Sequence, residues 1–284
     1  MAGSEALTLV ALTGADAAGG LALSAASGWN QTADDWELFI AQGYAIGFRS
    51  ASGALVATTA AIVYGGALGW ISMVLVDAEW RHRGLASLLL EGCIKRLQAA
   101  HVTPVLDATP AGEPVYRHLG FRAGFELERW ESSAPAGATA STRGADVRRA
   151  EVADFDAIAA LDQAASGIGR RPLLQAFFAR PDTRVWIAGD QSGFVYTRAG
   201  RIATQIGPLA APDPASAIAL LATALRAQDG PVFLDVPKRW SELAAWLEQA
   251  GFVRQRPYLR MALGAGAPMT CGDRMFVMAG PEFG

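Results

Sequence analysis

The stretch Val74-Leu75-Val76-Asp77-Ala78-Glu79-Trp80-Arg81-His82-Arg83-Gly84-Leu85-Ala86 decides the fold. An apolar run typical of a buried strand ends at Asp77, and a turn with two arginines and one glycine follows. From Leu85 onward, leucines recur at helical spacing. A strand, a glycine turn and a helix N-terminus together point backbone N–H groups at one anion, with the positive end of the helix dipole behind them. The stretch therefore predicts a site for an anionic group, most simply a pyrophosphate.

The composition fits a globular chain of one large domain or two domains of ordinary size. The chain has 284 residues, of which 51% are hydrophobic, so a substantial core is available and disorder is not expected. Its formal net charge is −3, and no long basic run is present. Nucleic acid is therefore not expected as a partner.

The cysteine and histidine content bears on compartment and metal binding. Only Cys93 and Cys271 are present, too few for a disulfide framework, so we expect a reducing, cytoplasmic location. Cys93 falls within the helix after the turn and is expected in the core. Three histidines without clustered Cys or carboxylate neighbours predict no metal site. The N-terminus lacks the basic region of a signal peptide, because the first basic residue is Arg49.

The segment Ser50–Val76 contains no charged residue and is long enough to span a bilayer. Glycines at 65, 66 and 69 interrupt it, and β-branched residues flank them. Buried strands joined by a glycine turn explain this pattern better than a membrane span, so no membrane is expected.

The chain contains an internal repeat of about 130 residues. A strand followed by Asp16 returns before Asp154, and Gly120-Phe121 returns as Gly251-Phe252. This spacing predicts two copies of one domain. We place the domains at residues 1–131 and 145–284, with a Ser/Ala/Gly/Pro-rich linker at 132–144.

Both halves predict an α+β fold with a mixed sheet. In the first half a helix capped by Thr32 or Asp34 precedes the strands. The predicted strands and helices of the first half are Tyr44–Ser50, Leu55–Tyr64, Leu68–Asp77, the helix Leu85–Ala100, Val105–Ala108, the helix Glu113–Leu119 and Phe121–Glu131. The second half repeats this order less cleanly, and its tail Met275–Pro281 is apolar enough for a final paired strand.

The motif Arg81-x-x-Gly84-x-Ala86 resembles the acyl-CoA signature of the GCN5-related N-acetyltransferase (GNAT) superfamily. The segment Val115–Phe121 resembles the Tyr-x-x-x-Gly-Phe ending of that family. The whole chain resembles tandem GNAT proteins with a YitH-like C-terminal half, through 28–32, 206–209, 235–237 and 279–284. The resemblance implies two tandem domains, each a mostly antiparallel twisted sheet flanked by helices.

The second half departs from the motif where the anion would bind. It reads Ala211-Pro212-Asp213-Pro214-Ala215-Ser216, in which two prolines lack N–H donors and Asp213 brings a negative charge. We therefore expect a single CoA site, in the first half. The second half is expected to be a degenerate duplicate that forms a wall or lid.

The resemblance implies acetyl-CoA as the acyl donor. The backbone near Met73–Leu75 is implied to polarise the thioester carbonyl through a bulged strand. The expected donor-binding residues are Val74, Leu75, Val76, Arg81, His82, Arg83, Gly84, Leu85, Ala86 and Ser87.

Tyr116 stands where many GNAT enzymes place the general acid that protonates the departing thiolate. A packed tyrosine is the competing interpretation. Asp107 is a candidate base, although it could equally cap a turn. Glu37 and the group Trp29, Asn30 and Gln31 are candidates for the acceptor pocket, or for a helix entry.

We therefore predict a cytoplasmic acyl-CoA-dependent N-acyltransferase, acting on a small-molecule amine by direct attack in a ternary complex, as a monomer or homodimer. A non-catalytic acyl-CoA-binding or regulatory module, and a protein or peptide N-acetyltransferase, are the alternatives. Asp235 is expected to be structural.

Overall fold

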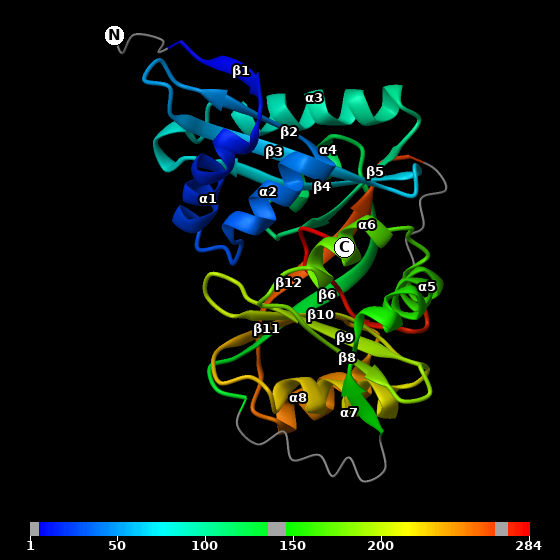
Figure 1. Cartoon of the computed structure of the whole chain (residues 1–284). Coiled ribbons are helices and arrows are strands. Elements are labelled where there is room, and N and C mark those ends of the chain that lie inside the picture. Colours follow the sequence, from blue (N-terminus) through cyan, green and yellow to red (C-terminus); the bar gives the residue numbers. More distant parts are fainter. Residues whose placement is uncertain (1–5, 136–145, 265–271) are drawn as a thin grey trace. The chain divides into compact units, whose positions relative to one another are not determined.

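The computed structural model of the protein describes residues 6–135, 146–264 and 272–284 (Figure 1). The chain forms two compact units, unit 1 with residues 1–106 and unit 2 with residues 107–284. Both contain a mixed sheet with helices, which confirms the predicted α+β class. Among the described residues, no helix combines the length and the apolar character that crossing a bilayer requires.

Unit 1 contains a sheet in which β1, β2, β3 and β4 are antiparallel neighbours and β5 runs parallel to β4. Its helices α1 and α2 precede β2, and α3 connects β4 to β5. The bounds are β1 Thr8–Ala11, α1 Ala17–Ala26, α2 Ala33–Gln42, β2 Gly43–Arg49, β3 Leu55–Tyr64, β4 Leu68–Val76, α3 Leu85–Ala99 and β5 Thr103–Ala108, whose last two residues belong to unit 2. The uncharged segment 50–76 thus forms two strands and a turn, as predicted.

The helices of unit 1 cover opposite faces of its sheet (Figure 1). Helix α3 packs closely on β4. A Cβ added at Gly69 of β4 would lie only 2.6 Å from a methyl carbon of Leu97 on α3. Side chains alternate along a strand, so Trp70 and Ser72 point to the other face, on which α1 and α2 lie. Thr32 caps α2: its hydroxyl accepts from the Asp35 N–H, and the Asp35 carboxylate accepts from the Thr32 N–H at 2.9 Å.

Unit 2 repeats this strand order with additions. Strands β7 to β10 are antiparallel neighbours, β11 runs parallel to β10, and β6 pairs antiparallel with both β11 and β12. The bounds are α4 Glu113–His118, β6 Arg122–Ser132, β7 Val147–Arg149, α5 Phe155–Ser166, α6 Arg171–Phe178, β8 Arg184–Ala188, β9 Phe194–Arg198, β10 Thr204–Ala210, α7 Pro214–Leu225, β11 Val232–Pro237, α8 Ser241–Gln249, β12 Val253–Ala262 and β13 Met275–Val277.

The pairing of β6 explains where the compact units divide. By sequence, β6 ends the first repeat, but its partners in unit 2 are β11 and β12 of the second repeat. The compact units therefore divide at 106/107, whereas the repeats predicted from the sequence divide at 131/145. Most of the predicted linker 132–144 lies outside the described residues.

Candidate functional site

The predicted anion turn joins β4 to α3 through one short 3₁₀ turn, Ala78–Trp80. The Asp77 carboxylate accepts from the Glu79 N–H at 3.0 Å and so begins that turn. Two residues then adopt the left-handed region, His82 with φ 61° and Gly84 with φ 75°. Glycine reaches this region without steric cost. These two positions reverse the chain so that α3 begins directly behind the end of β4.

Both arginines of the turn are held by backbone oxygens. The Nε of Arg81 donates to the Val76 oxygen at 3.2 Å, and Arg83 donates to the Glu79 oxygen at 3.0 Å. The Arg83 guanidinium also lies 4.6 Å from the centre of the buried Trp80 ring. The side chains are otherwise exposed, so two positive charges are fixed at the surface of the turn.

The N-terminus of α3 has no side-chain cap. Its N-cap residue is Gly84, which has no side chain to accept from the first N–H groups of the helix. In α7, the equivalent helix of unit 2, the Asp213 carboxylate accepts from the Ser216 N–H at 2.9 Å. A carboxylate of the chain itself therefore caps α7 in unit 2, whereas no side chain caps α3 in unit 1.

Strand β4 carries a β-bulge at Met73 and Val74, shortly before the strand ends at Val76. Leu75 pairs with Thr58 and Ser72 with Ala60, so Met73 and Val74 together oppose one residue of β3. Met73 has φ 52°, and its carbonyl oxygen accepts from the Thr58 hydroxyl at 2.8 Å. A bulge re-aims the backbone N–H groups beside it. The bulge implied by the family resemblance is therefore present at the predicted position.

One edge of β4 pairs with β3, and the other edge pairs with β5 only along the first part of the strand. Parallel pairing with β5 runs from Leu68 and Thr103 to Trp70 and Val105, and no further pair follows. Within the described part of unit 1, no strand hydrogen-bonds that edge of 71–76. An extended ligand with amide groups can pair there, because a strand edge presents N–H and C=O groups in a row.

Tyr116 lies on α4, in unit 2, whereas the anion turn lies in unit 1. Its half-buried ring packs 5.9 Å from the ring of Phe121. Burial raises the pKa of the Tyr116 hydroxyl to about 12. No other described residue hydrogen-bonds this hydroxyl. Tyr116 therefore stays protonated at neutral pH, with its proton available to a ligand.

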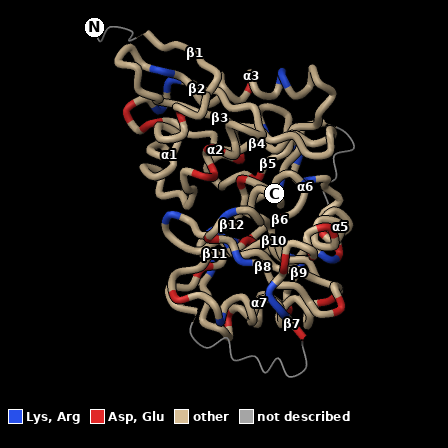
Figure 2. The backbone as a smooth tube through the Cα atoms, in the orientation of Figure 1, with Lys and Arg blue, Asp and Glu red and all other residues tan. Residues whose placement is uncertain are grey.

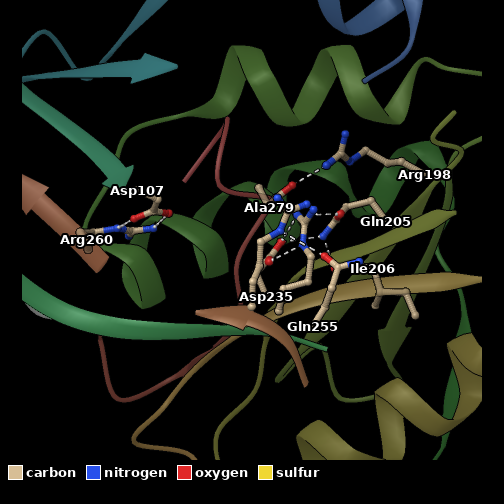
Figure 3. Close-up of polar contacts among 10 residues, drawn as sticks. Asp107, Arg198, Gln205, Ile206, Asp235, Gln255, Arg260 and Ala279 are labelled. Atoms are coloured by element: carbon tan, nitrogen blue, oxygen red, sulfur yellow. Dashed lines mark hydrogen bonds and ion pairs between the residues drawn. The ribbon is translucent and has the colours of Figure 1, made fainter. Parts of the chain in front are cut away.

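Asp107 forms a buried ion pair with Arg260, both in unit 2 (Figure 3). Its two carboxylate oxygens accept from Nε and from one terminal nitrogen of Arg260, each at 2.8 Å. The side chain of Asp107 has no exposed surface. Burial raises the pKa of Asp107 above its ordinary value, and the charge of Arg260 opposes this rise. These contacts favour a structural ion pair, because a base would have to give up one of them.

The residues predicted to line the acceptor pocket lie around the connection of α1 and α2. Asn30 is buried, Trp29 is half-buried and Glu37 is exposed. Gln31, which the sequence also placed among the acceptor-pocket candidates, and Ser72, which sequence reasoning did not single out, lie in this part of unit 1 as well. The side-chain oxygen of Gln31 and the hydroxyl of Ser72 are buried without a hydrogen-bond partner in the described structure. For Ser72, the only sequence signal is a polar residue within an apolar strand.

Charge and metal-ligand distribution add no second site. Figure 2 shows Lys and Arg interspersed with Asp and Glu along the chain. Among the described residues, no group of three or more His, Cys, Asp and Glu side chains is placed to hold a metal. Cys93 is fully buried in α3, and burial raises the pKa of its thiol to about 12, so it packs in the core.

Two family models match the chain, and both describe an acetyltransferase (GNAT) domain. One matches residues 31–131 and the other matches residues 158–276. A relative from Bacillus subtilis (strain 168), described as the uncharacterized N-acetyltransferase YitH, is 26% identical over 238 residues. That match covers 82% of this chain and 83% of the relative.

Solved structures share the fold over nearly the whole chain. A putative acetyltransferase from Pyrococcus horikoshii has a TM-score of 0.82 at 18% identity, covering 98% of this chain and 96% of the other. A tandem GNAT protein from the clavulanic acid biosynthesis pathway has a TM-score of 0.67 at 14% identity. It covers 92% of this chain, and 99% of its own length is matched. Both matches extend across the two repeats.

The Asp107–Arg260 pair predicts a large and pH-dependent effect of Arg260→Met. Removing Arg260 leaves the Asp107 carboxylate buried alone, so we expect a loss of about 3–5 kcal/mol in unfolding free energy at pH 7. It also raises the folded-state pKa of Asp107 further. The loss should therefore be small below about pH 4, where the carboxyl is protonated in both states, and should grow as the pH rises. Denaturant unfolding across this pH range measures it.

The double variant Asp107→Leu/Arg260→Met is the matched control. It removes both charges and should recover most of the stability lost by Arg260→Met. A loss below about 1 kcal/mol for Arg260→Met at pH 7 would contradict a structural ion pair, since exposed pairs give such values.

Proposed function

Because this chain belongs to the GNAT superfamily and carries two GNAT domains in tandem, we propose that it transfers an acetyl group from acetyl-CoA to a small-molecule amine, with unit 1 binding the donor. The family implies an acyl-CoA donor. Acetyl is the proposed acyl group, and a small amine is the proposed acceptor. One observation carries the proposal: the bulged, half-unpaired edge of β4 leads directly to the uncapped N-terminus of α3.

In this proposal the pyrophosphate of CoA binds the turn. The open N–H groups at the start of α3 and the positive end of its dipole favour an anion there. Arg81 and Arg83 add charge, since both are held at the turn by backbone oxygens. The donor-binding residues proposed for this part are Arg81, His82, Arg83, Gly84, Leu85, Ala86 and Ser87.

The amide-containing arm of CoA then runs along the free edge of β4. This edge, at Val74, Leu75 and Val76, is the part of the strand without a pairing partner in unit 1. The bulge at Met73 and Val74 aims a backbone N–H away from the regular ladder, where it can donate to the thioester oxygen. Charge develops on that oxygen when the amine attacks, so the N–H stabilises the transition state.

We propose the following steps for the transfer. The amine nitrogen attacks the thioester carbonyl carbon, the C–S bond breaks, and sulfur leaves with the electron pair as a thiolate. The Tyr116 hydroxyl donates its proton to that thiolate, and water later returns a proton to the tyrosinate. The attacking amine releases its own proton to water. Because water accepts the amine proton in this proposal, Asp107 can keep both of its hydrogen bonds from Arg260.

The acceptor is proposed to bind on the face of the unit 1 sheet that carries α1 and α2. Trp29, Asn30 and Glu37 are the proposed contacts. The buried, unpartnered oxygens of Gln31 and Ser72 support a polar ligand or a bound water in the same part of unit 1. The free, buried Cys93 agrees with a reducing, cytoplasmic compartment.

A non-catalytic acyl-CoA-binding module is the second candidate function. The observation that favours it is the Asp107–Arg260 pair, because the predicted base is engaged in an ion pair. Such a module would bind acetyl-CoA as the enzyme does. It would not turn over any amine, and removing the Tyr116 hydroxyl would change nothing that could be measured.

Gly84→Val tests the donor site. A Cβ at this position would have no other atom of the protein within 4 Å apart from its chain neighbours, although φ 75° strains any residue with a side chain. We expect the Kd for acetyl-CoA to rise at least about 10-fold, because the side chain enters the space of the pyrophosphate and distorts the turn. Isothermal titration measures the Kd.

Gly53→Val is the matched control for Gly84→Val. Gly53 also has a left-handed backbone, with φ 85°, and no neighbouring atom within 4 Å, but it lies in the turn between β2 and β3. It should lower stability by a similar amount and leave the Kd unchanged. Equal affinity of the two variants for acetyl-CoA would refute the donor site.

Tyr116→Phe tests the proposed acid. Its hydroxyl has no hydrogen-bond partner in the described structure, so the change should leave stability nearly unaltered. We expect kcat to fall about 10²-fold or more, as for loss of a general acid. Because the pKa of Tyr116 is about 12, its ionisation should cause no fall of the wild-type rate below about pH 10. Rates of thiol release across pH measure both effects.

Tyr44→Phe serves as the control for this substitution. Tyr44 lies on β2, and its ring contacts the Arg96 guanidinium at 4.2 Å, a contact that phenylalanine keeps. Its kcat should match the wild type. An unchanged kcat for Tyr116→Phe would show that another group donates the proton, whereas no turnover of any amine by the wild type would favour the non-catalytic alternative.

A further inference from the structure

Unit 2 contains the same parallel strand pair as unit 1, but the space beside it is filled. Strands β10 and β11 pair in parallel from Thr204 and Val232 to Ile206 and Leu234, and then stop, as β4 and β5 do. Beyond that point β13 pairs antiparallel with β10. The N–H of Met278 donates to the Asp235 oxygen of β11 at 2.9 Å. The segment around β13 is therefore hydrogen-bonded to both strands.

The bulge of β4 also has a counterpart in β10. Gly207 and Pro208 together oppose Tyr196, because Ile206 pairs with Thr197 and Leu209 with Val195. Pro208 has no N–H, so this bulge lacks one of the donors that the bulge in β4 presents. A Cβ at Gly207 would lie 1.9 Å from the Met278 carbonyl oxygen. The backbone of the C-terminal segment thus lies directly against the bulge.

The residues just after β10, and the N-terminus of α7 that follows them, are also hydrogen-bonded by the chain itself. The Ala211 N–H, just after β10, donates to the Arg274 oxygen at 3.0 Å. Asp213 then caps α7, with its carboxylate accepting from the Ser216 N–H and hydroxyl at 2.9 and 3.0 Å. These hydrogen bonds from Ser216, the backbone one first, lower the pKa of Asp213, although burial opposes them. The carboxylate is therefore ionised and occupies the anion position.

Two buried arginines donate hydrogen bonds to the backbone of the residues that follow Met278. Arg198 of β9 donates to the Ala279 oxygen (Figure 3), and Arg170 donates to the Gly284 oxygen. Both carboxylate oxygens of Asp162 in turn accept from Arg170, at 2.8 and 2.9 Å, in an ion pair whose side chains are each 1% exposed. The charge of Arg170 is thus compensated, and its guanidinium is oriented toward the segment.

Two phenylalanines of the C-terminal residues 275–283 also pack against aromatic rings of unit 2. Phe276 stacks on Trp240 with ring centres 4.0 Å apart, and the Trp240 indole N–H donates to the Met275 oxygen at 2.7 Å. Phe283 packs edge-on against Phe177 at 5.1 Å. Both phenylalanines are fully buried. The segment is therefore part of the core of unit 2 and not a loosely attached tail.

We propose that residues 274–279 are an internal occupant of unit 2, taking the place beside β10 that the acyl-CoA arm takes beside β4 in unit 1. The segment supplies the backbone hydrogen bonds that an extended ligand would supply, and Asp213 supplies the anion. Unit 2 is thereby closed to acyl-CoA, and its buried arginines donate hydrogen bonds to the chain's own backbone. The occupant is defined by contacts within unit 2 and does not depend on the activity of unit 1.

Hydrogen–deuterium exchange of the full chain, read by peptide mass spectrometry with and without saturating CoA, tests the proposal. Amides of 275–279 should exchange as slowly as those of the central strands, and CoA should change neither them nor 205–216. CoA should slow exchange at 72–76 and 84–88. Slower exchange at 205–216, or faster exchange at 275–279, when CoA is added would overturn the internal occupant. No change in unit 1 would instead overturn the proposed donor site and leave the occupant supported.

A pair of glycine variants tests the contact at the bulge without any ligand. Gly207→Ala places a Cβ against the Met278 oxygen and should speed exchange at 275–279 by roughly tenfold or more. Gly251→Ala is the control, since Gly251 also has a left-handed φ, 81°, but no atom within 4 Å of its Cβ. Equal exchange at 275–279 in the two variants would contradict the proposal. If Gly207→Ala fails to fold, the CoA comparison on the wild type still decides.

Discussion

The structure depends on one feature of backbone hydrogen bonding: two parallel strands that pair for three residues and then stop pairing. This happens between β4 and β5 in unit 1 and between β10 and β11 in unit 2. Buried N–H and C=O groups need partners, so the edge exposed at this point has to be satisfied. Unit 2 satisfies it with β13. In our account, unit 1 satisfies it with the acyl donor.

The different roles that we propose for the two units rest on this difference. A glycine at the start of α3 leaves helix N–H groups open, whereas Asp213 closes those of α7. Unit 2 also has buried charges that pair with one another. The Asp235 carboxylate accepts two hydrogen bonds from Arg129 at 2.8 Å and one from Gln205 at 3.0 Å (Figure 3). A fully satisfied buried network of this kind favours one arrangement of strands, which fits the structural role expected for Asp235.

Local sequence patterns predicted the parts of the structure that depend on local chemistry. The turn 81–86, the strands β3 and β4 and the helix α3 follow from glycine positions and apolar periodicity, and their bounds agree within about two residues. The bulge at Met73 could not be read from residues, because it arises from the register between β3 and β4. The family resemblance alone implied it.

Contacts between residues that are far apart in the sequence could not be predicted either. Asp107 pairs with Arg260, which is 153 positions away, so its sequence neighbourhood suggested a base and not an ion pair. The tail Met275–Pro281 was expected to form a strand, but its place between β10 and β11 depends on where those strands diverge. The pairing of β6 with strands of the second repeat likewise depends on tertiary structure.

The central claim is that the chain carries this fold twice and binds an acyl donor once. Isothermal titration of the full chain with acetyl-CoA tests it most directly, because the stoichiometry counts donor sites whatever the acceptor is. The account predicts one molecule of acetyl-CoA bound per chain. Two molecules per chain would show that unit 2 is open to the donor, and no binding would remove the donor site from unit 1.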